Sequence, residues 1–256
     1  MTAQIASLRI IDTHMHLGRS SISGVENRVE DLLSSMEENG VSMGLILPQA
    51  SQFTDVFSVH EKIREAALTY PERFRGVMCV NPRLGDELYF AEADKCFREF
   101  GFLAIKLDPN IHAVPIESFF SERVFCAAEK YGVPVIIHTG SGVYSNPVFA
   151  IPMAKRFPDV KIVLAHAGML TYASEATLAA RLCDNIFLEC SWSATMHLQK
   201  MIREIGTHKM MFGSDHISNL PVELAKLRAL RLNASQTDDI AFRTAEEVFQ
   251  LKSKGE

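Results

Sequence analysis

The chain has 256 residues, of which 47% are hydrophobic and 22% are charged, values typical of a globular protein with a sizeable core. A formal net charge of −5 leaves no basic surplus, so the composition argues against nucleic acid or an anionic membrane as the main partner. No run approaches the roughly 18 apolar residues of a membrane span, and the first residues lack the pattern of a signal peptide. The five cysteines form no CxxC pair. We therefore expect a cytoplasmic protein with reduced thiols.

Short apolar segments recur along the chain at intervals of about 30 residues. Each is rich in Val, Ile, Leu and Phe and is apolar at most positions rather than at every second one. This pattern is typical of strands that are covered on both faces in a parallel sheet. The eight predicted strands cover residues 8–12, 41–47, 74–80, 101–107, 133–138, 160–166, 185–190 and 209–215.

Segments with helical periodicity separate the predicted strands. The clearest lie within residues 25–40, 60–74, 119–132 and 193–206, and three of them end on a glycine that can cap a helix. Eight strand-helix units predict a closed (β/α)8 TIM barrel, an α/β fold in one domain over residues 1–256. Residues 236–251 are expected to add one amphipathic helix after the eighth unit. An open doubly wound sheet is the alternative, but the first turn lacks the GxGxxG glycines of a dinucleotide site.

Most of the nine histidines fall near the carboxyl ends of predicted strands, where barrels of this kind build their active sites. His14 and His16 end the first strand, His138 ends the fifth and His166 ends the sixth. Side chains two residues apart on a strand point the same way, so His14 and His16 are expected to project together at the barrel mouth. Asp215 ends the eighth strand, which neighbours the first in a closed barrel.

These side chains predict a metal site. Neutral imidazole nitrogens and a carboxylate are good ligands for a divalent transition metal, so the first strand is expected to hold a metal together with Asp215, and His138 faces them across the barrel. An isolated HxH pair can be a polar strand end without a ligand, but several such signals at one barrel mouth outweigh that reading. Asp12 either orients a ligand as a hydrogen-bond acceptor or hydrogen-bonds within the barrel.

The sequence resembles the amidohydrolase superfamily, and most of all the amidohydrolase-related branch that contains the aminocarboxymuconate semialdehyde decarboxylases. The segments that carry the resemblance follow one another in family order: IDTHMHLG, YPERFRGVMCVNP, GFLAIKLDP, VPVIIHTG, FPDVKIVLAHAG, NIFLECS and MMFGSDHIS. The resemblance implies that His14, His16, His138 and Asp215 bind one divalent metal, commonly zinc. It implies that His166 is a catalytic residue near the metal-bound water or the substrate, or the ligand of a second metal.

Lys106 stands on the fourth strand, where members with two metals often carry a carboxylated lysine or a glutamate as a bridge. Three roles are open to it: a carboxylated bridge, a cation for a substrate carboxylate, or a structural ion pair such as one with Asp108. Arg19, just after the HxH strand, is the second candidate cation. Loops on the same face offer aromatic side chains that either bind a substrate or pack within their loops: Phe53, Tyr144 and Trp192.

Two classes of reaction fit these residues. A divalent metal lowers the pKa of its water from 15.7 toward about 7, and Asp215 can take the proton of that water. The first expectation is therefore a metal-dependent hydrolase of a C–N or C–O bond in an amide, lactone or ester of a small metabolite, with a small-molecule substrate and no nucleic acid or membrane partner. The alternative is a non-oxidative decarboxylase or hydratase, with Asp215 or His166 as the acid and Lys106 or Arg19 on the substrate carboxylate. A barrel that only binds is a distant third, and a homodimer, common among relatives, is left open.

Overall fold

The computed structural model describes residues 8–20, 24–51 and 54–251. Eight parallel strands form a curled sheet in which each strand lies beside the one before it in the chain. They are β1 (Ile11–Arg19), β3 (Met43–Pro48), β4 (Phe74–Met78), β5 (Ala104–Leu107), β6 (Val135–His138), β7 (Ile162–Ala165), β8 (Ile186–Glu189) and β9 (Met210–Met211). The short strand β2 (Glu26–Asn27) pairs antiparallel with the end of β1.

The sheet closes between its last and first strands. Beyond β9 the chain continues beside β1, where the backbone N–H of Thr13 donates to the carbonyl of Phe212 over 3.1 Å. The N–H of Asp215 donates to the carbonyl of His14 over 2.8 Å, and Asp215 forms a parallel bridge with Met15. These contacts confirm the predicted (β/α)8 barrel and place the end of the eighth strand beside the first.

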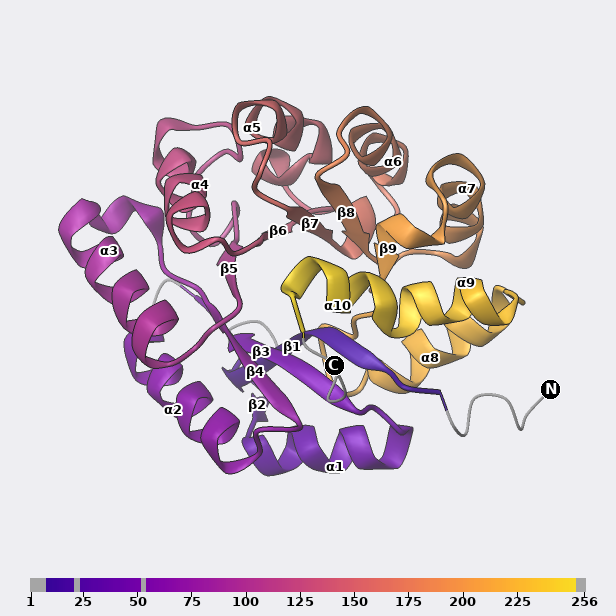
Figure 1. Ribbon diagram of the computed structural model, residues 1–256, viewed down its shortest axis with the longest axis horizontal. Helices are drawn as coiled ribbons and strands as arrows, with labels where there is room; N and C mark the ends of the chain where they lie inside the picture. Colours follow the sequence, from indigo (N-terminus) through magenta and orange to yellow (C-terminus); the bar gives the residue numbers. More distant parts are fainter. Residues whose placement is uncertain (1–7, 21–23, 52–53, 252–256) are drawn as a thin grey trace.

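Helices surround the barrel and cover the outer faces of the strands (Figure 1). They are α1 (Val29–Asn39), α2 (Val56–Thr69), α3 (Asp86–Asp94), α4 (Phe119–Tyr131), α5 (Ala150–Arg156), α6 (Ala173–Leu182), α7 (Thr195–Ile205) and α8 (Leu220–Ala229). The helix expected within residues 25–40 starts only at Val29, because the residues before it form β2. The helix expected within residues 60–74 starts earlier, at Val56, because the Asp55 side chain accepts the N–H of Ser58 as an N-cap.

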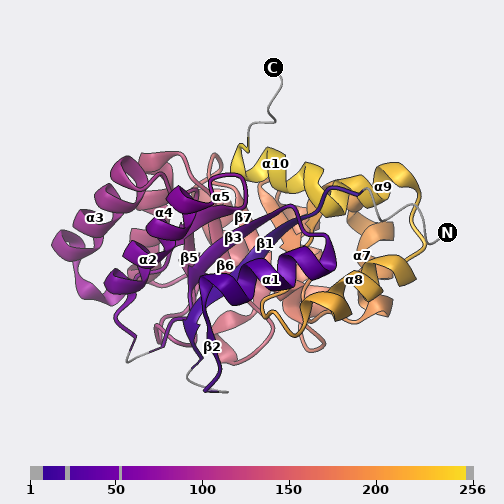
Figure 2. The same ribbon diagram turned by 90° about the horizontal axis from the view of Figure 1, so that it is seen from below.

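The C-terminal segment closes one end of the barrel. α9 (Ala234–Asp238), a π-helical turn (239–243) and α10 (Thr244–Phe249) follow one another without a break, so the extra helix expected over residues 236–251 is present and starts slightly earlier. Val248 and Phe249 pack against the apolar interior of the barrel, including Ile11 and Leu45. Figure 2 shows α10 and β2 at opposite ends of the barrel, which leaves the end that carries β2 for a site. Among the described residues, no helix has the length and apolar character needed to cross a membrane.

Candidate metal centre

An irregularity in β1 turns two histidines toward the barrel mouth. The pairing of β1 with β3 shifts register between Asp12 and Met15. Before the shift, Ile11 belongs to the apolar interior of the barrel, whereas Met15, after it, packs in the layer between strands and helices. A bulge of this kind reverses which residues of a strand face inward. His14 and His16 therefore project inward together, as their spacing predicted.

Three side-chain atoms converge at this mouth. His14 Nε2 lies 3.2 Å from His16 Nε2. Asp215 Oδ1 lies 3.3 Å from the first nitrogen and 3.2 Å from the second. His14 is fully buried, whereas His16 and Asp215 are partly accessible. The structure thus brings together the three residues that the first and eighth strands were predicted to supply.

The outer nitrogens of the two histidines show which ring atoms carry the protons. His14 Nδ1 lies 3.0 Å from Glu189 Oε2, and His16 Nδ1 lies 3.1 Å from the carbonyl oxygen of Pro48. Both partners are acceptors, so both Nδ1 atoms donate and both Nε2 atoms keep a lone pair. The two imidazole nitrogens and the carboxylate oxygen that meet here are all acceptors, and none of the three carries a proton. This donor set fits a divalent transition metal, for which neutral imidazole and carboxylate are common ligands.

Glu189, at the end of β8, orients this half of the site and was not identified from the sequence. Its Oε2 accepts hydrogen bonds from His14 Nδ1 (3.0 Å), the backbone N–H of His166 (3.1 Å) and the hydroxyl of Ser191 (2.9 Å). The side chain is only 1% exposed. An acceptor behind a metal-binding histidine fixes its tautomer and ring orientation. One signal could have found it: a carboxylate at the carboxyl end of the otherwise apolar segment NIFLEC.

Asp12 takes the second of the two roles left open for it. Its Oδ1 accepts the backbone N–H groups of His14 and Ser214, both over 3.0 Å, and so joins β1 to the segment that follows β9. Complete burial raises the pKa of Asp12 to about 7. Asp12 thus hydrogen-bonds within the barrel, whereas Glu189 contacts the ring of His14.

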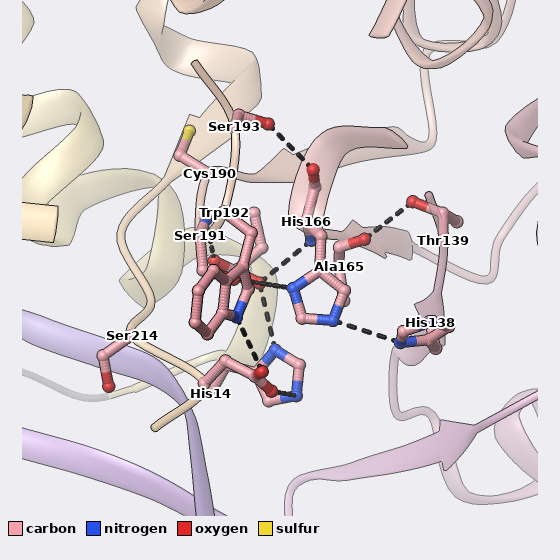
Figure 3. A network of polar contacts seen from close by, with 12 residues as sticks. His14, His138, Thr139, Ala165, His166, Cys190, Ser191, Trp192, Ser193 and Ser214 are labelled. Carbon is pink, nitrogen blue, oxygen red and sulfur yellow. Dashed lines mark hydrogen bonds and ion pairs between the residues drawn. The ribbon is translucent and has the colours of Figure 1, made fainter. Parts of the chain in front are cut away.

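His166 and His138 form the other half of the site. His166 Nδ1 lies 2.7 Å from Ser191 Oγ, and His166 Nε2 lies 3.1 Å from His138 Nδ1. Figure 3 shows this line of contacts from Ser191 through His166 to His138. His138 Nε2 in turn lies 2.8 Å from Ser141 Oγ. Both nitrogens of His138 are thus engaged, and His138 is outside the group formed by His14, His16 and Asp215. It would have to release one of these contacts to bind a metal.

Burial sets the charge state of the site. It lowers the pKa of His14 and of His166 well below the usual range, and it also lowers the pKa of His138. Burial alone would raise the pKa of Asp215, but the surrounding imidazoles, led by His166 and His14, hold it well below its usual range. At neutral pH the site therefore offers neutral nitrogens and an ionised carboxylate, the protonation state that metal binding requires.

Lys106 lies beside the convergent atoms. Its side chain is buried, and Nζ lies 3.1 Å from His14 Nε2. Burial lowers its pKa. The structural ion pair with Asp108 is absent among the described residues: Asp108 Oδ1 instead accepts the backbone N–H groups of Asn110 and Ile111. Of the three roles open to Lys106, the two that act at the metal or on the substrate agree with this position.

The other predicted substrate-binding residues lie in different surroundings. Arg19 is exposed at the end of β1. Its guanidinium group forms an ion pair with Glu26 of β2 over 3.4 Å at the rim of the barrel. Trp192 is 45% exposed, and its Nε1 donates to Asp215 Oδ2 over 2.7 Å. Tyr144 is exposed in the loop after β6, and Phe53 lies outside the described residues.

A second cluster of metal-binding residue types lies between α2 and α3, but it is a closed hydrogen-bond network. His60 Nε2 accepts the backbone N–H of Cys79 over 3.0 Å, so His60 Nδ1 carries the proton and donates to Glu92 Oε1 over 2.7 Å. Cys96 lies against both side chains. With one nitrogen accepting and the other donating, His60 has no lone pair left for a metal. We therefore do not propose a metal site at this cluster.

Comparison with known proteins identifies the family. The amidohydrolase family model matches residues 11–251. This chain belongs to the amidohydrolase family. The match covers every strand of the barrel and all the residues of the site, and it agrees with the resemblance that the sequence motifs carried. No curated protein matches the amidohydrolase chain.

Solved structures with the same fold cover nearly all of this amidohydrolase. An uncharacterised TIM-barrel protein from Bordetella bronchiseptica is 18% identical, with a TM-score of 0.78 over 95% of this chain and 99% of that one. A 2,6-dihydroxybenzoate decarboxylase from Rhizobium is 14% identical, with a TM-score of 0.76 over 96% and 100%. A 5-carboxyvanillate decarboxylase from Novosphingobium aromaticivorans, with bound manganese, is 15% identical, with a TM-score of 0.76 over 96% and 98%. At these identities the likeness establishes the fold alone.

Proposed function

We propose that this protein is a metal-dependent hydrolase that uses an activated water on a C–N or C–O bond of a small, carboxylated metabolite. The observation that supports it most is the convergence of His14 Nε2, His16 Nε2 and Asp215 Oδ1 within 3.3 Å of one another. These residues would hold the ion, with His138 as the fourth ligand once it leaves its present partners. Zinc is the proposed metal, and manganese is the alternative because a similarly folded decarboxylase binds it.

A divalent ion at this place supplies a Lewis acid that polarises a carbonyl group and acidifies water. Asp215 does the proton transfer. It is an ionised carboxylate at neutral pH, so it can accept the proton of the attacking water and pass it to the leaving group. Glu189 keeps the proton of His14 on Nδ1. His166, between Ser191 and His138, is the second proposed catalytic residue.

The place of Lys106 supports a carboxylated substrate. Its Nζ lies within hydrogen-bond distance of His14 Nε2. When His14 Nε2 binds an ion, it can no longer accept a hydrogen bond from Lys106. Among the described residues no other hydrogen-bond acceptor of the ammonium group is seen, so it would be buried without a partner, a costly state that a substrate carboxylate relieves. The exposed Arg19, paired with Glu26, is the weaker candidate for this role.

Non-oxidative decarboxylation is the second candidate, and Lys106 is the observation that favours it. A buried ammonium beside the metal ligands is the partner that a departing carboxylate group needs. In this reaction the C–C bond to the carboxylate breaks, carbon dioxide leaves, and the carbon takes a proton that Asp215 or His166 first takes up from the solvent. Two proteins of similar fold are decarboxylases of carboxylated aromatic compounds, which agrees with this alternative.

A product assay separates the two reactions. Metal-loaded protein is incubated in ¹⁸O-labelled water with carboxylated lactones and amides, and with carboxylated aromatic and diene acids. Hydrolysis predicts ¹⁸O in a new carboxylate, whereas decarboxylation predicts released carbon dioxide and an unlabelled product. At full metal occupancy, Asp215→Asn is expected to lower turnover by about 10²- to 10⁴-fold, because it removes the proton acceptor. A fully loaded Asp215→Asn variant that keeps the parent rate would contradict the role given to Asp215.

A further inference from the structure

The Asp215 carboxylate is divided between two sets of partners. Its Oδ1 faces the ring nitrogens of His14 and His16, whereas its Oδ2 accepts the indole N–H of Trp192 over 2.7 Å. Figure 3 shows the Trp192 indole on the same side of the site as His14. An aspartate carboxyl group rotates easily about its last bond, because this torsion has broad preferences. A hydrogen bond from the indole N–H to Oδ2 limits this rotation while Oδ1 faces the histidines.

Both partners of this hydrogen bond have an unusual backbone. Trp192 has φ 60° and Asp215 has φ 66°, in the left-handed region that side chains other than glycine rarely adopt. Such residues persist only where the surrounding structure holds them, and they concentrate at functional sites. We therefore expect neighbouring residues to hold the backbone of Trp192 and Asp215 in this conformation.

Helix α8 supplies that support to Trp192. Glu223 is only 4% exposed, and its Oε1 accepts the backbone N–H of Trp192 over 2.9 Å. Its Oε2 pairs with Lys226 over 2.5 Å, and Lys226 donates to the carbonyl of Ser193 over 2.8 Å. Two residues of one helix thus hold the backbone on both sides of the Trp192 side chain.

The same carboxylate also reaches the segment that carries Asp215. Glu223 Oε1 accepts from Asn219 Nδ2 over 2.8 Å, and Asn219 Nδ2 also donates to the carbonyl of Ser214 over 2.9 Å. Asn219, Glu223 and Lys226, which we call the α8 clamp, are spaced four and three residues apart and so share one face of the helix. The clamp joins the loop after β8 to the segment after β9.

We infer that Trp192 is a positioning residue that presents Oδ1 of Asp215 to a metal at the histidine pair, and that Glu223 acts through Trp192 from α8. This inference rests on the proposed metal-binding role of Asp215. Without the indole N–H the carboxylate is free to turn either oxygen, or neither, toward the histidines. Trp192 removes that freedom before the metal arrives, so it strengthens metal binding without touching the metal.

Zinc affinity tests the role of Trp192. Trp192→Phe removes the N–H donor and keeps an aromatic ring, and Zn²⁺ affinity is measured by competition with a chromophoric chelator. Loss of a partner behind a ligand predicts binding that is about 10- to 100-fold weaker. Asp215→Ala is the reference and must weaken binding if Asp215 is a ligand. Wild-type affinity in Asp215→Ala would overturn the proposed metal site, whereas weakened Asp215→Ala with wild-type affinity in Trp192→Phe would overturn only the positioning role.

Fluorescence tests the role of Glu223, because Trp192 is the only tryptophan of the chain. In Glu223→Ala, the indole is expected to lose anisotropy and zinc affinity is expected to fall, while Glu223→Gln, which keeps an acceptor oxygen, restores most of both. Arg228→Ala removes a charge from the exposed face of the same helix and is expected to change neither. A folded Glu223→Ala with the anisotropy and zinc affinity of the wild type would overturn the inference for the clamp.

Discussion

Replacing Glu189 by glutamine would test how the proposed ligands are held. Glu189 Oε2 accepts hydrogen bonds from His14, His166 and Ser191, and Oε1 accepts the backbone N–H of Ser191. A glutamine of the same shape has one carbonyl oxygen, and its NH₂ group must face at least one of these donors. Gly213 lies directly against Glu189, so the new side chain has little room to turn away.

The expected magnitudes follow from these contacts. A buried donor left without an acceptor costs about 1–3 kcal/mol, so Glu189→Gln should lower the free energy of unfolding of the metal-free protein by about 2 kcal/mol. If the amide replaces Oε2, His14 Nδ1 loses its acceptor and the ring its fixed tautomer. Zinc affinity should then fall about 10- to 100-fold, equivalent to about 1.4–2.8 kcal/mol.

Chelator competition measures the affinity, and chemical denaturation of the metal-free protein measures the stability. Glu92→Gln is the matched control, because it breaks a buried histidine–carboxylate pair of the same kind, with His60, in the cluster between α2 and α3. It should lose a similar amount of stability and keep the zinc affinity of the wild type. Two results would refute the reasoning. One is wild-type zinc affinity in Glu189→Gln, and the other is a loss of zinc affinity in Glu92→Gln equal to that in Glu189→Gln.

Two further predictions concern charge in the site. Lys106→Met should raise KM for a carboxylated substrate about 10- to 100-fold at unchanged metal content, because a charge-assisted hydrogen bond is lost. Arg19→Ala should change KM little, because Arg19 pairs with Glu26. Steady-state kinetics with the substrate found in the product assay would measure both values, and equal effects on KM would contradict the assignment of Lys106. Because burial raises the pKa of Asp12 to about 7, the folded protein retains a proton that the unfolded chain releases near pH 4; this stabilisation is complete below pH 4 and lost as pH rises to about 7. In metal-free protein, the free energy of unfolding of the wild type minus that of Asp12→Asn should therefore fall by on the order of 4 kcal/mol between pH 4 and pH 7. Denaturation curves that show the same difference between the two proteins at every pH would contradict the burial argument.

The sequence identified the parts of the site that depend on strand order. Apolar segments with a regular spacing predict a barrel, and a barrel places the ends of the first and eighth strands side by side, so His14, His16 and Asp215 could be grouped before any coordinates were known. The C-terminal helix was predictable from its periodicity for the same reason. Each of these inferences needs only local pattern and the closure of the sheet.

Other features of the site depend on how side chains are oriented and paired in the folded protein, which the sequence alone does not show. Glu189 is one carboxylate among many in the sequence, and only its burial against the His14 ring distinguishes it. Arg19 follows the metal-binding strand closely, yet the hairpin with β2 places Glu26 beside it. Trp192 was predicted either to bind a substrate or to pack within its loop, and its contact with Asp215 depends on a strained turn that composition does not reveal.

The central claim is that one divalent ion binds among His14, His16 and Asp215, and metal content tests it most directly. Elemental analysis of protein purified without chelator should find about one equivalent of a divalent transition metal per chain, which the His14→Ala/His16→Ala double variant should lack while remaining folded. Protein without metal that takes up neither zinc nor manganese on dialysis would contradict the claim. Two equivalents in the wild type would contradict the single-ion site and instead make Lys106 and His166 ligands of a second ion.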